Sequence, residues 1–402
     1  MPRTRLSPPE FIALIAALFS TIAFSIDAML PAMPEIALAL TPEAPNRAAL
    51  IITSFVLGMG IGTLFAGPLS DALGRRPVIL GGAVLYCAGA ALAWAAPSLE
   101  LALAGRVIQG LGGAGPRVVA VAIVRDLYAG RQMARIMSFV FLVFSLIPAI
   151  APSIGAGIMA LTGWRGIFGA FITFSVLSAF WLWLRQPETL PPAARRPFQA
   201  RSLLSSVREV LENRVLRLTI VVQTLAMGCL FSILSSTQQT FDQTFGRGNE
   251  FPLWFALIAI IAALSSLVNA RVVVRLGMRK MVRGALVFQI VSVLAFLAIS
   301  QLALPQPVYF AAYVAWNTSV FFMVGLTIGN LNAIALEPMG HIAGTAASVV
   351  GAIATVGSVL LAVPLGLQFD GTPVPIALGI CVLAVIGYGV MRVLGSRDEV
   401  PA

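Results

Sequence analysis

The sequence predicts an all-α membrane protein with twelve transmembrane helices in two six-helix bundles. Of its 402 residues, 59% are hydrophobic and only 10% are charged, and the mean hydropathy is +0.94, whereas soluble proteins carry about 25% charged residues. Twelve apolar runs are each long enough to cross the ~30 Å hydrocarbon core of a bilayer as a helix. The basic residues are distributed unevenly among the connectors between these runs, which is typical of a chain threaded through a membrane.

The expected spans follow one another closely except at one long connector. We place them at 11–34, 46–69, 77–96, 98–124, 133–160, 164–184, 215–242, 251–270, 281–302, 307–334, 342–367 and 373–394. The connector at 185–214 is polar and rich in Arg and Pro, and it separates an N-terminal bundle (1–184) from a C-terminal bundle (215–402). Leu276-Gly277-Met278-Arg279 weakly repeats Leu73-Gly74-Arg75-Arg76, which favours two related halves.

The basic residues predict the orientation of the chain. If the amino terminus is cytoplasmic, most of the 26 basic residues fall on the cytoplasmic side, and only Arg47, Arg165 and Arg247 fall in connectors on the other side. The positive-inside rule then places both termini in the cytoplasm. The net charge of +10 therefore orients the protein and does not indicate a nucleic-acid partner. The first apolar run is too long for a cleaved signal peptide.

The connector between the second and third spans carries an unusual set of residues. It reads Gly67-Pro68-Leu69-Ser70-Asp71-Ala72-Leu73-Gly74-Arg75-Arg76-Pro77. As a plain membrane-edge hairpin it would simply hold its arginines at the lipid headgroups. The order of residues, however, resembles the signature loop between helices 2 and 3 of the major facilitator superfamily, G-x-L-[SA]-D-x-x-G-R-[RK]-x.

That resemblance implies a role for this loop in gating. The family pattern assigns a latch for the outward-facing state to Gly67, Asp71, Gly74, Arg75 and Arg76, with Asp126 at the base of the fourth span. The acid at the end of the second span could also face the positive N-terminus of a helix from the other half. These residues are therefore expected to gate the protein and not to contact substrate.

Further motifs resemble one branch of the superfamily, the Bcr/CflA-type drug:proton antiporters. They lie at 24–34, 106–117, 148–157 and 335–348, and the resemblance extends from about Ser25 to Arg392. It implies a major facilitator fold and a proton-coupled secondary active transporter that exports small organic molecules by alternating access. We accordingly expect a monomer in a bacterial-type inner membrane, with protons, a small-molecule substrate and the lipid bilayer as partners, and with no cofactor beyond the proton gradient.

Asp27 is the only carboxylate well inside a predicted span, and Arg106 in the fourth span falls at a similar depth. A charge at the bilayer centre costs at least ~2.5–3.5 kcal/mol and usually faces a cavity or a partner. One interpretation is a static ion pair or a fixed polar peg. The other is a proton site, because loss of water favours the neutral carboxyl while a nearby cation favours the charged one. The family resemblance assigns proton and substrate coupling to Asp27, with Arg106 as electrostatic partner or substrate anchor.

The fourth span carries a polar stripe on one helical face. It consists of Arg106, Gln109, Gly110, Gly113 and Arg117. Such a face is unsuited to lipid, so we expect it to line the central cavity, although Arg117 could instead snorkel to the cytoplasmic surface. Two cations against one acid favour anionic or zwitterionic substrates over lipophilic cations.

Two further spans contain candidate residues. In the fifth, Pro148, Pro152, Gly155 and Gly157 indicate either ordinary kinked packing or a helix of the antiporter type, whose glycine pattern is partly altered here. In the seventh, we expect Met227, Phe231, Ser235 and Gln238 either to form a partly polar cavity wall or to serve plain helix packing. The three cysteines stand singly, without the spacing of a metal site or a disulfide.

The sequence leaves other functional classes open. A metabolite uniporter or a proton symporter of the same fold is the nearest alternative, and a uniporter would be insensitive to collapse of the proton gradient. An integral membrane enzyme is more distant, because the sequence has no clustered His, no paired intramembrane carboxylates and no nucleotide-binding glycine loop followed by Lys. In a non-transporting scaffold or receptor, Asp27 and Arg106 would cost stability without purpose.

Overall fold

The structure is a computed structural model that describes residues 6–395, and within that range it contains helices and loops but no strands. Twelve helical segments are long and apolar enough to cross a membrane. The predicted fold class, an all-α protein with twelve spans, is confirmed. The chain forms two compact units, one made of the chain up to Pro42 together with Ser54–Ser205, the other of Glu43–Thr53 and the chain from Ser206 onward.

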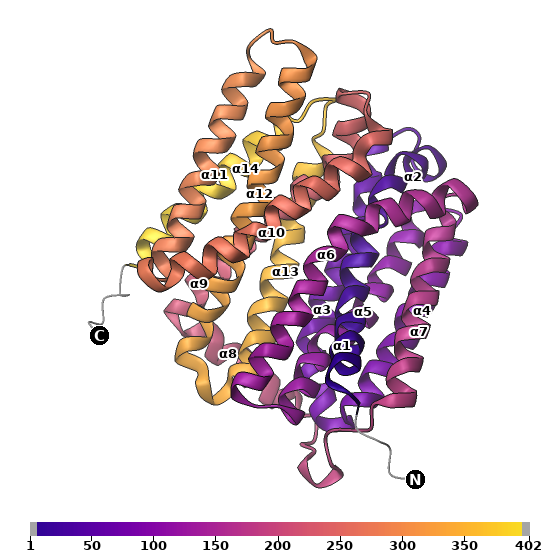
Figure 1. Cartoon of the computed structure of the whole chain (residues 1–402), viewed down its shortest axis with the longest axis vertical. Coiled ribbons are helices and arrows are strands. Elements are labelled where there is room, and N and C mark those ends of the chain that lie inside the picture. Colours follow the sequence, from indigo (N-terminus) through magenta and orange to yellow (C-terminus); the bar gives the residue numbers. More distant parts are fainter. Residues whose placement is uncertain (1–5, 396–402) are drawn as a thin grey trace. The chain divides into compact units, whose positions relative to one another are not determined.

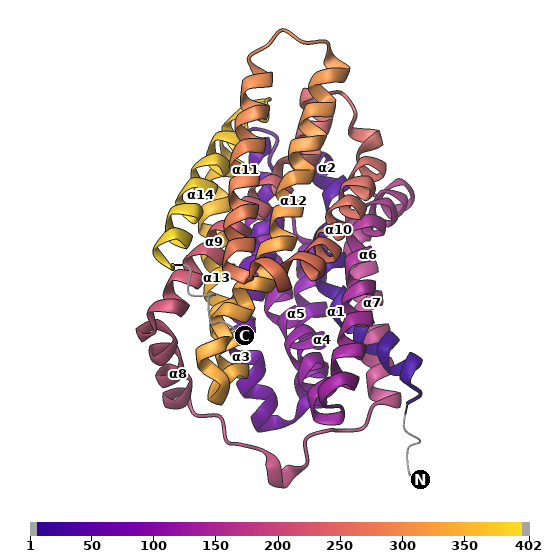
Figure 2. The ribbon, with the colours of Figure 1, turned by 60° about the vertical axis from the view of Figure 1, so that its left-hand side comes forward.

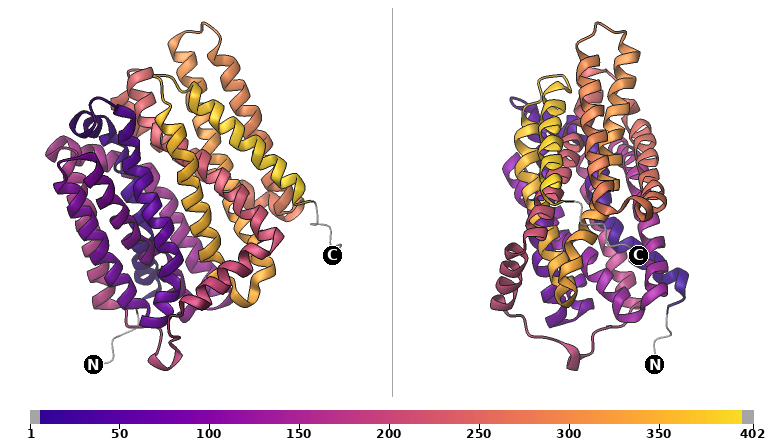
Figure 3. Two further views of the ribbon diagram at one scale, coloured as in Figure 1. Left: turned by 180° about the vertical axis from the view of Figure 1, so that it is seen from behind. Right: turned by 90° about the vertical axis from the view of Figure 1, so that its left-hand side faces the viewer.

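The first unit is drawn from indigo to magenta in Figure 1, with α1 packed on α6 and α4 packed on α7. Its helices are α1 (Pro8–Asp27), η1 (Leu30–Ala32), α2 (Met33–Leu40), α3 (Leu50–Leu73, from Ser54 on), α4 (Arg75–Ala95), α5 (Leu99–Leu127), α6 (Gly130–Thr162), α7 (Arg165–Arg185) and η3 (Pro192–Ala194). The segment after α7 leaves the helices as a loop, visible at the bottom of both views in Figure 3. It leads to α8 (Ala200–Glu212).

The second unit is built around α9, which packs on α12, α13 and α14. Its helices are η2 (Pro45–Ala49), α9 (Arg214–Gln239), η4 (Thr240–Thr244), η5 (Gly248–Glu250), α10 (Phe251–Leu276), α11 (Met278–Ser300), α12 (Gln306–Leu336), η6 (Glu337–Ile342), α13 (Ala343–Leu367) and α14 (Val374–Val393). Figure 2 shows α11 and α12 side by side, joined by the short loop 301–305.

The short segment before α3 is held in the second unit by hydrogen bonds to its helix ends. The Asn46 amide donates to the carbonyl oxygens of Leu367 (3.1 Å) and Phe369 (2.7 Å). Gln239 at the end of α9 donates to Asn46 Oδ1 over 2.7 Å. Since α3 runs from Leu50 to Leu73, its first turn belongs to the second unit and the rest to the first.

The first span is interrupted, whereas its hydropathy predicts an unbroken segment at 11–34. Helix α1 ends at Asp27, and the chain continues through η1 and α2. The cause is local, because proline has no amide hydrogen and its ring clashes with the carbonyl four residues earlier. Pro31 stands four residues after Asp27, and Pro34 stands near the start of α2.

Helix α5 packs between α3 and α4 through glycines on both of its sides. A Cβ atom at Gly89 of α4 would lie 2.6 Å from the carbonyl oxygen of Gly105, and one at Gly105 would lie 2.8 Å from that of Gly89. On the other side, a Cβ at Gly62 of α3 would lie 2.7 Å from the carbonyl oxygen of Leu111. Small residues let membrane helices approach closely enough for backbone to touch backbone.

We therefore predict that Gly89→Ala destabilises the protein while Gly81→Ala, on the same helix, does not. The added methyl group at position 89 overlaps the backbone of α5, and overpacking of this kind costs about 1–3 kcal/mol. A Cβ at Gly81 meets no atom within 4 Å. Thermal unfolding of the two purified variants checks this, and equal melting temperatures would show that the close approach of α4 to α5 is unimportant.

Candidate functional site

Asp27 lies at the break of the first span and is nearly enclosed, with 6% of its surface exposed. Helix α6 packs directly on the next residue, because a Cβ at Gly155 would overlap the carbonyl group of Ala28. The two prolines predicted to bend this helix, Pro148 and Pro152, both lie inside α6. Gly157 differs from Gly155, since a Cβ there would meet nothing within 4 Å. Gly155 is thus the member of this motif that shapes the surroundings of Asp27.

Arg106 of α5 is fully buried. Its guanidinium donates from Nη1 to Gln109 Oε1 (2.8 Å) and from Nη2 to the carbonyl oxygen of Ser25 (3.0 Å). It also lies over the rings of Phe55 at 4.4 Å and Phe171 at 5.8 Å, measured from Cζ to the ring centroid. A planar cation can use hydrogen bonds at its edge and aromatic contact on its face at the same time. These contacts compensate for the water that the buried cation has lost.

Asp27 and Arg106 are connected through α1 and not by a direct ion pair in the described part of the chain. Arg106 binds the backbone of Ser25, two residues before Asp27. The Ser25 hydroxyl is hydrogen-bonded to the hydroxyl of Tyr86 and donates to the Thr21 carbonyl oxygen at 2.5 Å. A movement of the last turn of α1 would therefore change the surroundings of both charged side chains.

The rest of the predicted stripe divides into a buried and an exposed part. Gln109 is fully buried, and its Nε2 atom has no hydrogen-bond partner. Gly113 lies against the rings of Tyr86 and Phe55, because a Cβ atom built at Gly113 would lie 3.5–3.6 Å from ring atoms of both residues. Arg117 is instead exposed. Arg106, Gln109 and Gly113 are thus brought together, and Arg117 stands apart from them.

The candidate residues of the seventh predicted span all lie on α9 in the second unit. Phe231, Ser235 and Gln238 are buried and Met227 is half-buried. Ser235 donates to the carbonyl oxygen of Ser232 at 3.0 Å, and Gln238 Oε1 has no hydrogen-bond partner. A buried amide oxygen that has no hydrogen-bond partner can accept a hydrogen bond from a further donor.

The connector between α3 and α4 forms a compact charged cluster centred on Arg75, which is only 4% exposed. Arg75 Nε donates to Asp126 Oδ2 (2.9 Å), and Nη1 donates to Asp71 Oδ1 (2.5 Å) and Ser70 Oγ (2.8 Å). Gly74 turns the chain with a positive φ of 107°. The Ser70 hydroxyl also donates to the carbonyl oxygen of Gly67 at 2.8 Å.

Arg76, the second arginine of the predicted latch, contacts α7. It donates to the carbonyl oxygen of Trp183 on α7, and its guanidinium lies 5.9 Å from the centroid of the Trp183 ring. The two neighbouring arginines thus bind different helices, α5 and α7. Arg75 forms the ion pair with Asp126 at the base of α5.

Glu188 and Thr189 belong to this cluster, although neither is among the residues predicted for the latch. The Glu188 carboxylate accepts from the backbone amides of Arg75 (2.9 Å) and Arg76 (3.0 Å), so it caps the N-terminus of α4. The Thr189 hydroxyl donates to Asp126 Oδ2 at 2.9 Å. The sequence did contain a signal for the role of Glu188, because this residue is the only acid between Asp126 and Glu209.

The described residues contain no group of three or more His, Cys, Asp or Glu side chains that could hold a metal ion. What remains is a chain of twelve spanning helices that holds a carboxyl and a guanidinium inside its spans. Such a combination is typical of a membrane transport protein.

Comparisons with known proteins agree with this class. A family model described as Major Facilitator Superfamily matches residues 13–362, and the chain belongs to this superfamily. The "Bicyclomycin resistance protein homolog" of Haemophilus influenzae is 28% identical over 94% of this chain and 95% of its own. The "Chloramphenicol resistance protein" of Pseudomonas aeruginosa is 29% identical over 93% of this chain and 88% of its own. The sequence resemblance stated above is confirmed.

Solved structures show the same fold. The POT family transporter PepTSo superimposes with a TM-score of 0.75 at 14% identity, covering 98% of this chain and 99% of its own. A D-xylose-proton symporter gives a TM-score of 0.73 at 14% identity, covering 95% and 97%. At such low identity the likeness concerns the fold alone.

The fixed position of Arg106 yields a prediction. Arg106→Lys should lower the free energy of unfolding by about 1.5–3 kcal/mol, the range for hydrogen bonds to charged groups, because an ammonium cannot reach Gln109 and Ser25 together while covering Phe55. The same substitution at Arg117, which is exposed on the same helix, should change stability little. Thermal unfolding of the two variants measures the difference, and a larger loss at Arg117 would contradict the geometry.

Proposed function

We propose that this protein exports small organic molecules from the cell in exchange for protons, by alternating access. Asp27 is the proton carrier, and the observation that carries this role is its position. Asp27 is a nearly enclosed carboxyl at a break in a spanning helix. Among the described residues it forms no ion pair with Arg106. A charged carboxylate is costly in such surroundings, so uptake and release of a proton can be tied to movement of α1.

The direction of transport is supported by the relatives. Two of them carry names of bicyclomycin and chloramphenicol resistance, and others are called multidrug resistance proteins. Export is the transport direction that would confer such resistance. The basic connectors support an inner-membrane orientation with both termini in the cytoplasm. We propose a monomer, with two bundles joined by the 185–214 connector.

Substrate binding in the first unit is proposed for Arg106, Gln109, Gly113 and Arg117. The second unit would contribute Met227, Phe231, Ser235 and Gln238 from α9. The first unit would present two cations, Arg106 and Arg117, and one acid, Asp27. This excess of positive charge supports anionic or zwitterionic substrates. The orphan donor Gln109 Nε2 and the orphan acceptor Gln238 Oε1 support hydrogen bonding to substrate from each unit.

The charged cluster around Arg75 is proposed as a gating latch. Arg75 joins the end of α3 to the base of α5 through Asp71 and Asp126. Opening of this end of the first unit would require those contacts to separate. The cluster lies outside the buried region around Asp27, so its role would be to bias the conformational equilibrium and not to bind substrate.

The proton role predicts the behaviour of Asp27→Asn. This variant keeps the shape of the side chain but cannot release a proton, so substrate-driven proton movement in liposomes should be lost while substrate binding remains. Asp370→Asn, in the exposed turn before α14, should retain full coupling. The measurement is the change of internal pH reported by a trapped dye when substrate is added.

Uphill export that survives in Asp27→Asn would refute the assignment of Asp27. Export that is unaffected when the proton gradient is collapsed would instead support the uniporter alternative. The two outcomes are distinguishable, because the first concerns one residue and the second concerns the energy source.

The charge of the substrate can be tested separately. We expect anionic or zwitterionic fluorescent dyes to be exported faster than cationic dyes of matched size and hydrophobicity. Arg117→Gln should reduce this preference, because it removes one of the two proposed cations. A clear preference for the cationic dyes in the unaltered protein would overturn the proposed substrate class.

A further inference from the structure

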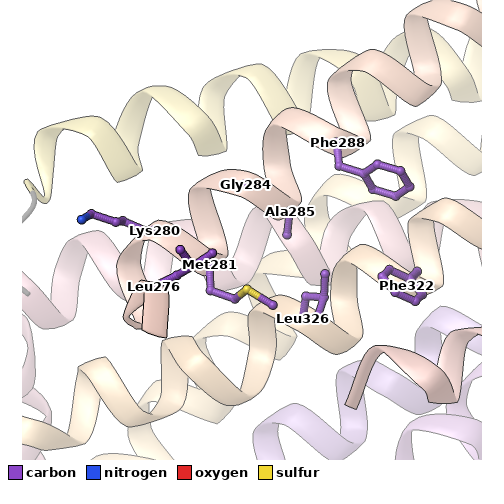
Figure 4. A pocket seen from close by; sticks show the side chains of 8 residues that line it. All are labelled: Leu276, Lys280, Met281, Gly284, Ala285, Phe288, Phe322 and Leu326. Carbon is purple, nitrogen blue, oxygen red and sulfur yellow. The ribbon is translucent and has the colours of Figure 1, made fainter. Parts of the chain in front are cut away.

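A narrow apolar groove runs along α11 and α12 in the second unit, at the end where α10 turns into α11. Figure 4 shows its walls, formed by Leu276, Met281, Phe288, Phe322 and Leu326. Its volume is about 160 Å³, well below the ~300–1,000 Å³ typical of sites for drug-sized ligands. It is therefore too small to be the main substrate site, and its apolar lining suits an acyl chain.

The groove exists because one position on α11 has no side chain. Gly284 lies in its lining, and a Cβ atom built there would meet nothing within 4 Å. The neighbouring apolar side chains are open to the surroundings, with Leu276 exposed by 49% and Phe288 by 48%. On a spanning helix such an apolar exposed surface faces lipid. The groove therefore opens where acyl chains are the abundant apolar molecules.

The end of the groove is strongly basic. Lys280 lines it there, at the opposite end of the row from Phe288 and Phe322 (Figure 4), and it is the only lysine in the sequence. Four arginines lie near it in sequence, namely Arg271, Arg275, Arg279 and Arg283, and no acid occurs between Glu250 and Glu337. The chain that forms this end of the groove thus carries several basic residues and no acidic one.

These observations together specify an occupant with an apolar chain and an anionic head. We propose that this groove is a binding site for an anionic phospholipid, with one acyl chain lying along Gly284 and the phosphate held at Lys280. A lysine ammonium acts as a point charge toward phosphate, and basic pockets between spanning helices on the cytoplasmic side recognise anionic headgroups. The groove shares no residue with the proposed proton and substrate sites, and the proposal does not depend on what the protein transports.

The unique lysine provides a direct readout of the proposal. In the purified full chain, an amine-reactive reagent modifies Lys280, and peptide mass spectrometry gives the rate, with any amino-terminal amine as internal reference. We expect phosphatidylglycerol to slow the modification of Lys280 several-fold relative to phosphatidylcholine with the same acyl chains. Inorganic phosphate at equal concentration should give no protection, because it lacks the chain that fills the groove.

Two matched substitutions separate the groove from simple surface charge. Gly284→Leu fills the groove, so phosphatidylglycerol should no longer protect Lys280. Gly389→Leu places the same side chain at an exposed glycine of α14, where a Cβ also meets nothing within 4 Å, and protection should persist. If Gly284→Leu fails to fold, Lys280→Gln supplies the test, since native mass spectrometry should then show one fewer retained phosphatidylglycerol than in the unaltered protein.

Several results would overturn the proposal. Equal protection by phosphatidylcholine would show that the site does not recognise an anionic headgroup. Protection that persists in Gly284→Leu would show that the lipid does not occupy the groove. Protection that rises with protein concentration in the absence of lipid would identify a second copy of the chain as the occupant. Unchanged retention of phosphatidylglycerol in Lys280→Gln would remove the role of the lysine.

Discussion

In the interior of a membrane every polar group must find its partner within the protein, and this requirement shapes the first unit around Arg106. The guanidinium is satisfied by one side chain from its own helix, one backbone carbonyl from α1, and two aromatic rings from α3 and α7. Such an arrangement needs helices at very short separations. The glycines that line both sides of α5 provide them, so packing and electrostatics in this unit support each other.

The same requirement acts differently at the end of the first unit, where charges meet the edge of the membrane. Here Arg75 is buried by other polar groups and not by aromatic rings, and its acidic partners come from α3 and α5. Glu188 from the segment after α7 satisfies the free amides at the start of α4. A single cluster thus joins four helices and the beginning of the connector, which makes the end of this bundle a cooperative structure.

Much of the architecture follows from the sequence, because membrane spans are encoded by local hydropathy. The twelve spans and the family were predicted correctly, and the interruption of the first span was not, although Pro31 and Pro34 contained the necessary information. The aromatic cage of Arg106 and the cap formed by Glu188 could not be predicted in the same way. Phe55 and Phe171 reach Arg106 from other helices, and Glu188 lies 113 residues from Arg75, so only the packing of helices brings them together. The inside orientation and the roles of the site residues stay predictions.

The hydrogen bonds of Asn46 have a mechanical consequence for the chain. Because the Asn46 side chain bonds both to Gln239 at the end of α9 and to the backbone at the end of α13, the segment before α3 is tied to the second unit. The first turn of α3 therefore moves with these helix ends unless the hydrogen bonds of Asn46 break. One asparagine side chain, acting as donor and acceptor at once, thereby fastens the entry of α3 to two other helices of the second unit.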